Sequence, residues 1–240
     1  MILNQGYLIK RKSTSRQVEP YTMRLIDPVE LPQVVKLQSL VYDGLQNKQV
    51  LYCDTEKDIL EDMEHGAMIL GVFNAQEKLI SYRYISFPKA TARNLGYDIH
   101  LRDLELDKVV HLETTLVSPE YRGNRLQSLT LSKAIELVEP MHMKHLLCTV
   151  SPYNPFSLYN IMSSGLKIKA LKRKYGKTEA SGMWRFILHK EITEDFACKP
   201  EAIQTIRMDD IRAQKKLIEA GYIGYNLVKE SQMIQYAYNC

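Results

Sequence analysis

The stretch 109–138 constrains the fold more than any other part of the chain. It begins with an apolar and β-branched run at 109–117, which predicts a strand, and Pro119 closes this strand because proline cannot donate to a ladder. Apolar residues then recur at the spacing of one helix face, namely Leu131, Ala134, Ile135 and Val138. The stretch therefore predicts a strand, a tight turn and a helix that is buried against a sheet.

The turn between this strand and this helix predicts an anion site at residues 122–127. The first backbone N–H groups of a helix have no partner within the helix and lie at the positive end of its dipole. Phosphate is the anion that a helix start most naturally binds. Gly123 allows close approach to the backbone, and Arg122 and Arg125 add positive charge.

The string V-S-P-E-Y-R-G-N-R-L-Q at 117–127 resembles motif A of the GNAT superfamily of N-acetyltransferases. In that superfamily the strand, turn and helix cradle the pyrophosphate of acetyl-coenzyme A, and the pattern is Arg or Gln, two residues, Gly, one residue, then Gly or Ala. Arg122 matches the first position. Arg125 stands where the middle glycine is expected, and Gln127 stands where the last small residue is expected.

A second segment, in the right order downstream, resembles motif B of the same superfamily. Residues 144–150 read as a strand, and Asn154 with Pro155 has good N-cap and N1 chemistry for a helix that ends at Gly165. The spacing of Asn154, Ser157 and Gly165 is similar to that of the motif B helix. The resemblance therefore rests on two ordered motifs.

Weaker strand signals extend the resemblance over about residues 21–189. It implies an α/β fold of the α+β kind, with a mixed, mostly antiparallel central sheet flanked by helices. Periodicity alone gives the element order β, α, α, β, β, β, α, β, α, β, β. Residues 88–108 lack a periodic pattern, so we expect a loop there that borders the acceptor pocket.

We expect three segments along the chain. Residues 1–19 read as a leader or an edge strand that Pro20 ends, and residues 20–191 read as the acetyltransferase domain. Residues 192–240 predict a helix followed by a hairpin, an extension that packs on the domain or forms an interface.

Composition bounds the partners and the compartment. At 240 residues and 45% apolar content the chain can bury an ordinary core, and its net charge of +4 allows an anionic ligand but falls short of the basic face of a nucleic-acid binder. Four scattered cysteines, Cys53, Cys148, Cys198 and Cys240, favour reduced thiols. No apolar run has the length of a membrane span, and the start lacks a signal-peptide core. We therefore expect a cytoplasmic protein that binds neither membrane nor nucleic acid.

The resemblance implies direct acyl transfer from acetyl-coenzyme A: an amine attacks the thioester carbonyl, an oxyanion develops, and coenzyme A leaves as a thiol. It assigns cofactor binding to residues of both motifs, namely Leu116, Val117, Arg122, Gly123, Asn124, Arg125, Leu126, Gln127, Asn154 and Ser157. The oxyanion donor is expected at the backbone N–H of Leu116 or Val117.

The catalytic candidates are His111, Glu113 and Ser157. His111 and Glu113 alternate on one strand face and are candidate bases, although either can instead face solvent or satisfy a buried partner. The superfamily's usual acid, a tyrosine seven residues after the motif B asparagine, is replaced here by Ile161. Tyr159 points to roughly the opposite side of the helix, and Ser157 faces the right way but is a poor acid, so water or no acid at all remains.

Two function classes stay open. The first is an N-acetyltransferase that acts on a small-molecule or peptide amine in a ternary complex, with a homodimer as one option. The second is a non-catalytic acyl-coenzyme A binding or sensing module, which the Ile161 replacement favours. His142 and His145 form an H-x-x-H pattern without a convincing third ligand, so a structural or surface role is favoured over a metal site and we expect no metal.

Overall fold

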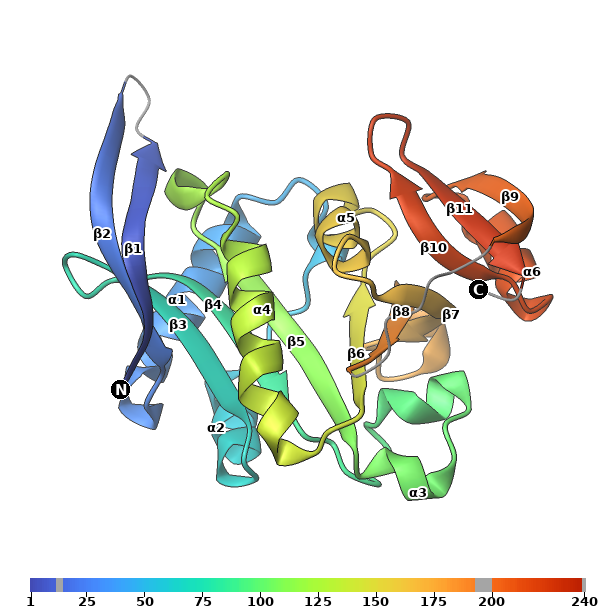
Figure 1. Cartoon of the computed structure of the whole chain (residues 1–240), viewed down its shortest axis with the longest axis horizontal. Helices are drawn as coiled ribbons and strands as arrows, with labels where there is room; N and C mark the ends of the chain where they lie inside the picture. Colours follow the sequence, from blue (N-terminus) through green and yellow to red (C-terminus); the bar gives the residue numbers. More distant parts are fainter. Residues whose placement is uncertain (12–14, 193–199, 239–240) are drawn as a thin grey trace. The chain divides into compact units, whose positions relative to one another are not determined.

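The computed structural model describes residues 1–11, 15–192 and 200–238 (Figure 1). Two compact units divide the chain. Unit 1 comprises Met1–Lys48, Tyr52–Phe87 and Leu112–Met141, and unit 2 comprises Gln49–Leu51, Pro88–His111 and His142–Cys240.

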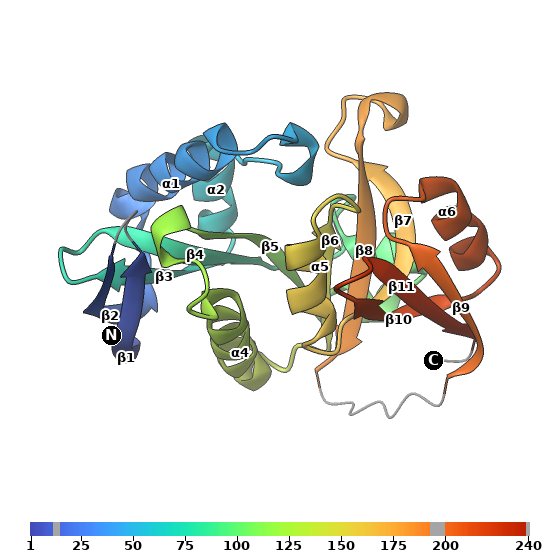
Figure 2. The ribbon, with the colours of Figure 1, turned by 90° about the horizontal axis from the view of Figure 1, so that it is seen from above.

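Unit 1 is a sheet with helices on both faces. The strands follow the order β1-β2-β3-β4-β5, and the first four pair antiparallel. They are β1 (Ile2–Arg11), β2 (Arg16–Leu25), β3 (Met68–Asn74), β4 (Leu79–Ser86) and, from Leu112 onward, β5 (Val109–Val117). The helices are α1 (Leu31–Asp43), α2 (Glu56–Glu64) and α4 (Leu126–Val138). Figure 2 shows α1 and α2 on one face of the sheet and α4 on the other.

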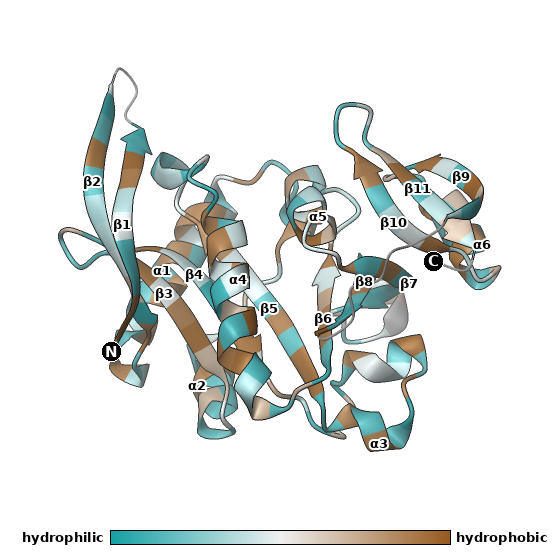
Figure 3. Ribbon diagram, viewed as in Figure 1, coloured by the Kyte–Doolittle hydropathy of each residue, from teal (hydrophilic) through white to brown (hydrophobic). Residues whose placement is uncertain are grey.

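The strand β3 is central to the core of unit 1. It is buried along almost its whole length, and Figure 3 shows its hydrophobic run. A cluster of buried side chains joins the N-terminal hairpin, the sheet and the start of α4: Leu8, Tyr21, Met23, Leu70, Val72, Ile80, Tyr121 and Leu126. The motif strand and the motif helix therefore pack as their periodicity predicts.

Unit 2 contains a run of mainly antiparallel strands. Its order is β5-β6-β8-β7-β10-β11-β9, and β5 enters it through Val109–His111, which pair parallel with His145–Leu147. The other strands are β6 (His145–Val150), β7 (Lys167–Lys174), β8 (Met183–Glu191), β9 (Glu201–Arg207), β10 (Ile223–Val228) and β11 (Met233–Tyr238). The helices are η3 (Leu95–Ile99), α3 (Asp103–Leu106), α5 (Pro155–Met162) and α6 (Ile211–Glu219).

The predicted element order is confirmed from β2 to β8, as are the C-terminal helix and hairpin, now α6, β10 and β11. The expectation that Pro20 ends the first segment is wrong, because β2 begins at Arg16 and continues through Pro20. Pro20 pairs with Tyr7 on β1, whereas the ladder to β3 begins at Tyr21. Proline has no backbone N–H. Because the ladder between β2 and β3 begins only after Pro20, this costs no hydrogen bond with β3. The three-segment division itself stays a prediction.

Three further elements were not predicted from the sequence pattern: η3, α3 and β9. Residues 88–108, expected to be a loop, contain η3 and α3. Asn94 organises them, since its side-chain oxygen accepts from the N–H of Gly96 at 2.8 Å and its amide nitrogen donates to the carbonyl of Leu106 at 3.0 Å. The strand β9 is exposed along most of its length, so it has no alternating pattern to detect.

Unit 2 places two histidines side by side, His145 buried and His189 half-buried. Nδ1 of His145 on β6 lies 3.0 Å from Nε2 of His189 on β8, whereas His142, the other histidine of the H-x-x-H pattern, is exposed. Burial lowers the pKa of both rings, to about 3 for His189, where the neighbouring His145 ring adds to the effect. Both histidines are therefore neutral in the folded protein near pH 7.

We expect the free energy of unfolding to fall as the pH drops from about 6.5, the ordinary pKa of histidine, toward the lowered values in the fold. Below that pH the unfolded chain binds more protons than the folded one, so stability present above pH 6.5 is progressively lost. His189→Asn should lose less stability than the wild type between pH 7 and pH 5 in circular-dichroism melts. His142→Asn, at the exposed position, should keep the wild-type slope; a wild-type slope in His189→Asn would contradict the assignment.

Candidate functional site

The turn after β5 has a positive φ at two positions, of which only one is a glycine. Gly123 has φ +87°, and Arg125 has φ +55° and ψ +25°, the left-handed region. A non-glycine residue there costs roughly 1–2 kcal/mol. Arg125 thus takes a glycine-like conformation at the position where the motif A pattern has glycine.

Arg125 is also the N-cap of α4. Good N-caps carry a side-chain oxygen that accepts from the first turn, and acidic residues favour this end of a helix. Arginine has no such oxygen, and no acidic residue stands in the first turn of α4. The helix therefore starts with a cation instead of an acceptor, which favours an external anion at this end.

A buried arginine lies against the first turns of α4. Arg83 on β4 is 2% exposed, its Nη2 donates to the carbonyl of Gln127 at 3.0 Å, and its Nε donates to the hydroxyl of Thr130 at 3.3 Å. This guanidinium adds positive charge near the start of α4. Sequence periodicity did not indicate Arg83, because a charged residue in a strand is ordinarily exposed.

Tyr121 fixes the turn to the sheet. Its hydroxyl donates to the carboxylate of Glu19 on β2 and accepts from the side-chain amide of Asn74 on β3 at 3.1 Å. Burial and the neighbouring Glu19 raise the pKa of the Tyr121 hydroxyl, so it remains a donor. The turn thus depends on the first two strands after β1 in this sheet.

Asn124 pairs the turn with the edge of β1. Its Oδ1 accepts from the N–H of Ile9 at 2.8 Å, and its Nδ2 donates to the carbonyl of Ile9 at 2.8 Å and to that of Tyr121 at 2.8 Å. Beside it, the guanidinium of Arg11 occupies the space that a Cβ on Gly123 would take. Gly123 is therefore required for its positive φ and for this contact, in addition to the predicted approach of a ligand.

The end of β5 directs its backbone groups alternately. The carbonyl of Leu116 accepts from the hydroxyl of Ser81 on β4 at 2.8 Å, and the N–H of Ser118 donates to the carbonyl of Ile80 on β4 at 2.8 Å. Since N–H directions alternate along a strand, Val117, between them, directs its N–H away from β4. On the same strand the Thr115 hydroxyl is buried and has no hydrogen-bond partner among the described residues.

The two candidate bases occupy different surroundings on β5. His111 is 4% exposed, and its Nε2 accepts from the N–H of Leu95 at 3.0 Å. Glu113 is half-buried, and its Oε1 accepts from the hydroxyl of Ser86 on β4 at 2.8 Å. The bond from the Leu95 N–H occupies the Nε2 lone pair of His111, whereas the Glu113 carboxylate has several acceptor sites.

No protein-family model matches this sequence, and a search of curated proteins finds no match. Solved structures, in contrast, do match this chain. An acetyltransferase of the GNAT family from Streptococcus pneumoniae has 18% identity, with 71% of this chain and 99% of that chain covered and a TM-score of 0.53. A GNAT superfamily phosphinothricin acetyltransferase from Sinorhizobium meliloti, in complex with AcCoA, has 16% identity, 76% and 94% coverage and a TM-score of 0.53. A ribosomal-protein-alanine N-acetyltransferase from Brucella melitensis has 12% identity, 70% and 98% coverage and a TM-score of 0.53.

The chain has the GNAT fold. The mixed, mostly antiparallel architecture expected from the two motifs is thereby confirmed. In this GNAT fold, unit 1 brings together Glu113, the end of β5 and the turn 122–127, whereas His111, Asn154 and Ser157 belong to unit 2.

The second motif forms α5 as predicted. Oδ1 of Asn154 accepts from the N–H of Ser157 at 3.1 Å, which confirms the N-cap, and Pro155 stands at the first helical position. Ile161 is 8% exposed, so the position of the superfamily's tyrosine is filled by a core residue. The ammonium of Lys229 lies 4.8 Å from the ring centre of Tyr159, so this ring faces the connection between β10 and β11.

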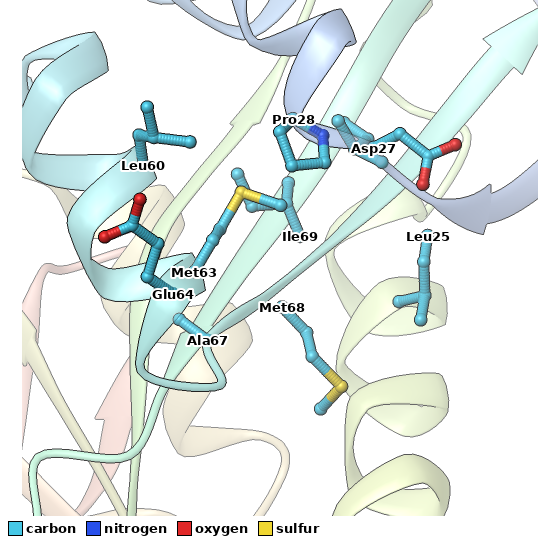
Figure 4. A pocket seen from close by; sticks show the side chains of 10 residues that line it. Leu25, Asp27, Pro28, Leu60, Met63, Glu64, Ala67, Met68 and Ile69 are labelled. Atoms are coloured by element: carbon cyan, nitrogen blue, oxygen red, sulfur yellow. The ribbon is translucent and has the colours of Figure 1, made fainter.

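A hollow of about 370 Å³ in unit 1 is a separate feature (Figure 4). It is lined by Leu25, Ile26, Asp27, Pro28, Leu60, Met63, Glu64, Ala67, Met68 and Ile69. These residues come from the end of β2 and the turn after it, from α2 and from the start of β3, whereas the turn 122–127 follows the opposite end of the antiparallel strands. The hollow is therefore not part of the predicted cofactor site.

Neither a metal-ligand cluster nor a membrane-spanning helix occurs within the described ranges. They contain no group of three or more histidine, cysteine or acidic side chains that could hold a metal ion. No helix within them has both the length and the hydropathy to cross a membrane. Cys53 is a free thiol and Cys148 is buried, while Cys198 and Cys240 lie outside the described residues.

We expect Tyr121→Phe to lower the free energy of unfolding by about 1–3 kcal/mol, because it leaves the buried Glu19 carboxylate without this donor. Tyr7→Phe is the matched control, since Tyr7 is 76% exposed and should change stability by less than about 0.5 kcal/mol. Urea unfolding of the two variants gives the comparison. Equal stabilities would show that the phenol does not hold the turn.

Proposed function

We propose that this protein is an N-acetyltransferase that moves an acetyl group from acetyl-coenzyme A to a primary amine by direct transfer in a ternary complex. The observation that carries the proposal is the start of α4, where a cationic, left-handed N-cap favours an external anion in a GNAT fold. A cytoplasmic location and a homodimer remain predictions from the sequence.

The turn fits the phosphates of acetyl-coenzyme A. The backbone of residues 122–127 and the exposed guanidiniums of Arg122 and Arg125 would hold them, as the helix start and the positive charge favour anions. When bound, acetyl-coenzyme A supplies the activated thioester that the amine attacks. The Sinorhizobium meliloti neighbour, solved with AcCoA, supports this assignment by its shared fold. We also propose Asn154 and Ser157 of α5 as cofactor contacts.

The backbone at the end of β5 would stabilise the developing oxyanion. Of the two predicted donors, Val117 is favoured over Leu116, because the carbonyl of Leu116 faces Ser81 on β4 and the Val117 N–H points the other way. The buried hydroxyl of Thr115 is a further polar group on this strand that a bound ligand could satisfy.

Glu113 is the base that the geometry favours. It would accept the proton of the incoming amine while its Oε1 keeps the hydrogen bond from Ser86. His111 would first have to give up the bond from the Leu95 N–H. The proposed acceptor is a small-molecule or peptide amine. The Brucella melitensis neighbour is named for an alanine of a ribosomal protein, which supports the peptide alternative.

The second candidate is a non-catalytic acyl-coenzyme A binding or sensing module. It is favoured by the buried Ile161 at the tyrosine position and by the contact of Tyr159 with Lys229. Ser157 is a poor general acid, and a module that only binds acyl-coenzyme A needs no general acid. Both candidates require that the turn bind the cofactor, and turnover separates them.

We expect acetyl-coenzyme A at 100 times its dissociation constant to stabilise the fold by about 2.7 kcal/mol, which raises the melting temperature by several degrees. Arg125→Gly removes the guanidinium while glycine keeps the left-handed backbone, so it should reduce the shift without unfolding the protein. Coenzyme A release across an amine panel then decides between the two candidates. No thermal shift with the wild type would refute both candidate functions.

Given turnover, we expect Glu113→Gln to lower kcat by about 10² to 10⁴, the usual contribution of a general base, with little change in cofactor affinity. Glutamine can still accept from Ser86, so the fold should survive. Tyr159→Phe is the matched control and should stay within a few-fold of wild type, because its ring faces Lys229. A large loss in Tyr159→Phe and none in Glu113→Gln would reverse both roles.

A further inference from the structure

Arg11, the last residue of β1, lies directly over the turn of motif A. Its guanidinium fills the position that a side chain on Gly123 would occupy. Arg11 is exposed, so this face of the turn is lined by a cation that water and solutes can reach. The motif pattern itself, which begins at residue 122, gives no hint of a contribution from residue 11.

The N-terminal hairpin, formed by β1 and β2, is held against the turn by specific contacts. Asn124 makes two hydrogen bonds of 2.8 Å with the backbone of Ile9. Next to it, the ammonium of Lys10 lies 3.8 Å from the carboxylate of Glu120 and 5.5 Å from the ring centre of Tyr121. The end of β1 is therefore positioned by the turn and not by the hairpin alone.

The hairpin also places two positive charges directly opposite each other. Arg11 and Arg16 are register partners in the antiparallel pair, so their side chains leave the same face of the hairpin. Like charges directly opposite each other are destabilising. Neither arginine is buried, and Arg11 lies beside a turn that already carries Arg122 and Arg125. An anionic ligand at this place would offset a repulsion that the folded chain otherwise sustains.

We propose that Arg11 is a phosphate-binding residue, which contacts the diphosphate of coenzyme A from above the motif A turn. The inference rests on the proposed function of that turn as a cofactor site. Guanidinium suits the role, because its planar fork can donate two parallel hydrogen bonds to phosphate oxygens. The N-terminal hairpin then completes the cofactor site, so residues 1–11 take part in binding in addition to extending the sheet.

The test is calorimetric titration of the full chain with coenzyme A. Arg11→Gln should bind about tenfold more weakly than the wild type, the low end for a hydrogen bond to a charged group. Arg11→Lys should recover only part of the loss, because a lysine keeps the charge but not the fork. The control is Lys36→Gln, which removes one positive charge from an exposed position on α1, on the other face of the sheet, and should match the wild type.

The outcomes separate the inference from the function on which it rests. A wild type that binds no coenzyme A refutes the proposed function. A wild type that binds, with Arg11→Gln at unchanged affinity or with Lys36→Gln equally weakened, refutes the role of Arg11 alone. Dephospho-coenzyme A, which keeps the diphosphate and lacks the 3′-phosphate, should show the same loss in Arg11→Gln. A loss confined to coenzyme A would overturn the assignment to the diphosphate. Matching melting temperatures of the free variants exclude a folding defect.

Discussion

The start of α4 depends on a conformation that its own residues oppose. Arg125 takes a left-handed backbone and places a cation at the positive end of the helix dipole. Such strain persists only where the surroundings over-determine it. Here the surroundings are Tyr121, bonded to β2 and β3, and Asn124, bonded to β1. The turn is therefore held by three strands that are remote from it in the sequence, and its local cost is consistent with a functional site.

The hydrogen bonds between Asn124 and Ile9 give the N-terminal strand β1 a second role. A strand at the edge of a sheet exposes unpaired backbone groups, and proteins usually cover or blunt them. The carboxamide of Asn124 satisfies both backbone groups of Ile9, as a neighbouring strand would. Since Arg11 follows two residues later, covering the edge also delivers a guanidinium to the turn. Edge protection and the proposed binding of phosphate thus depend on one side chain of the turn, Asn124.

Local signals predicted much of the fold, and long-range contacts account for what was missed. The β-branched run of β5 and the N-cap at Asn154 act within a few residues, so both were readable and both are confirmed. The link between Asn124 and Ile9 joins residues 115 positions apart, and no period or spacing encodes it. Arg83 was missed for the same reason, because only the packing of α4 on β4 buries it. The assigned roles of the site residues remain predictions.

The absence of a tyrosine at Ile161 bears unequally on the two proton transfers. A thiol has a pKa near 8.5, so at pH 7 the departing thiolate is less favourable than the thiol by only about 2 kcal/mol. An alkylamine has a pKa near 10.4, so at the same pH fewer than about one in a thousand molecules carries the lone pair that attacks. Loss of the acid is thus the smaller penalty, while loss of the base would be severe. A GNAT fold with Glu113 in place and an isoleucine for the tyrosine is therefore chemically compatible with turnover, and its pH dependence should follow the amine and not the thiol.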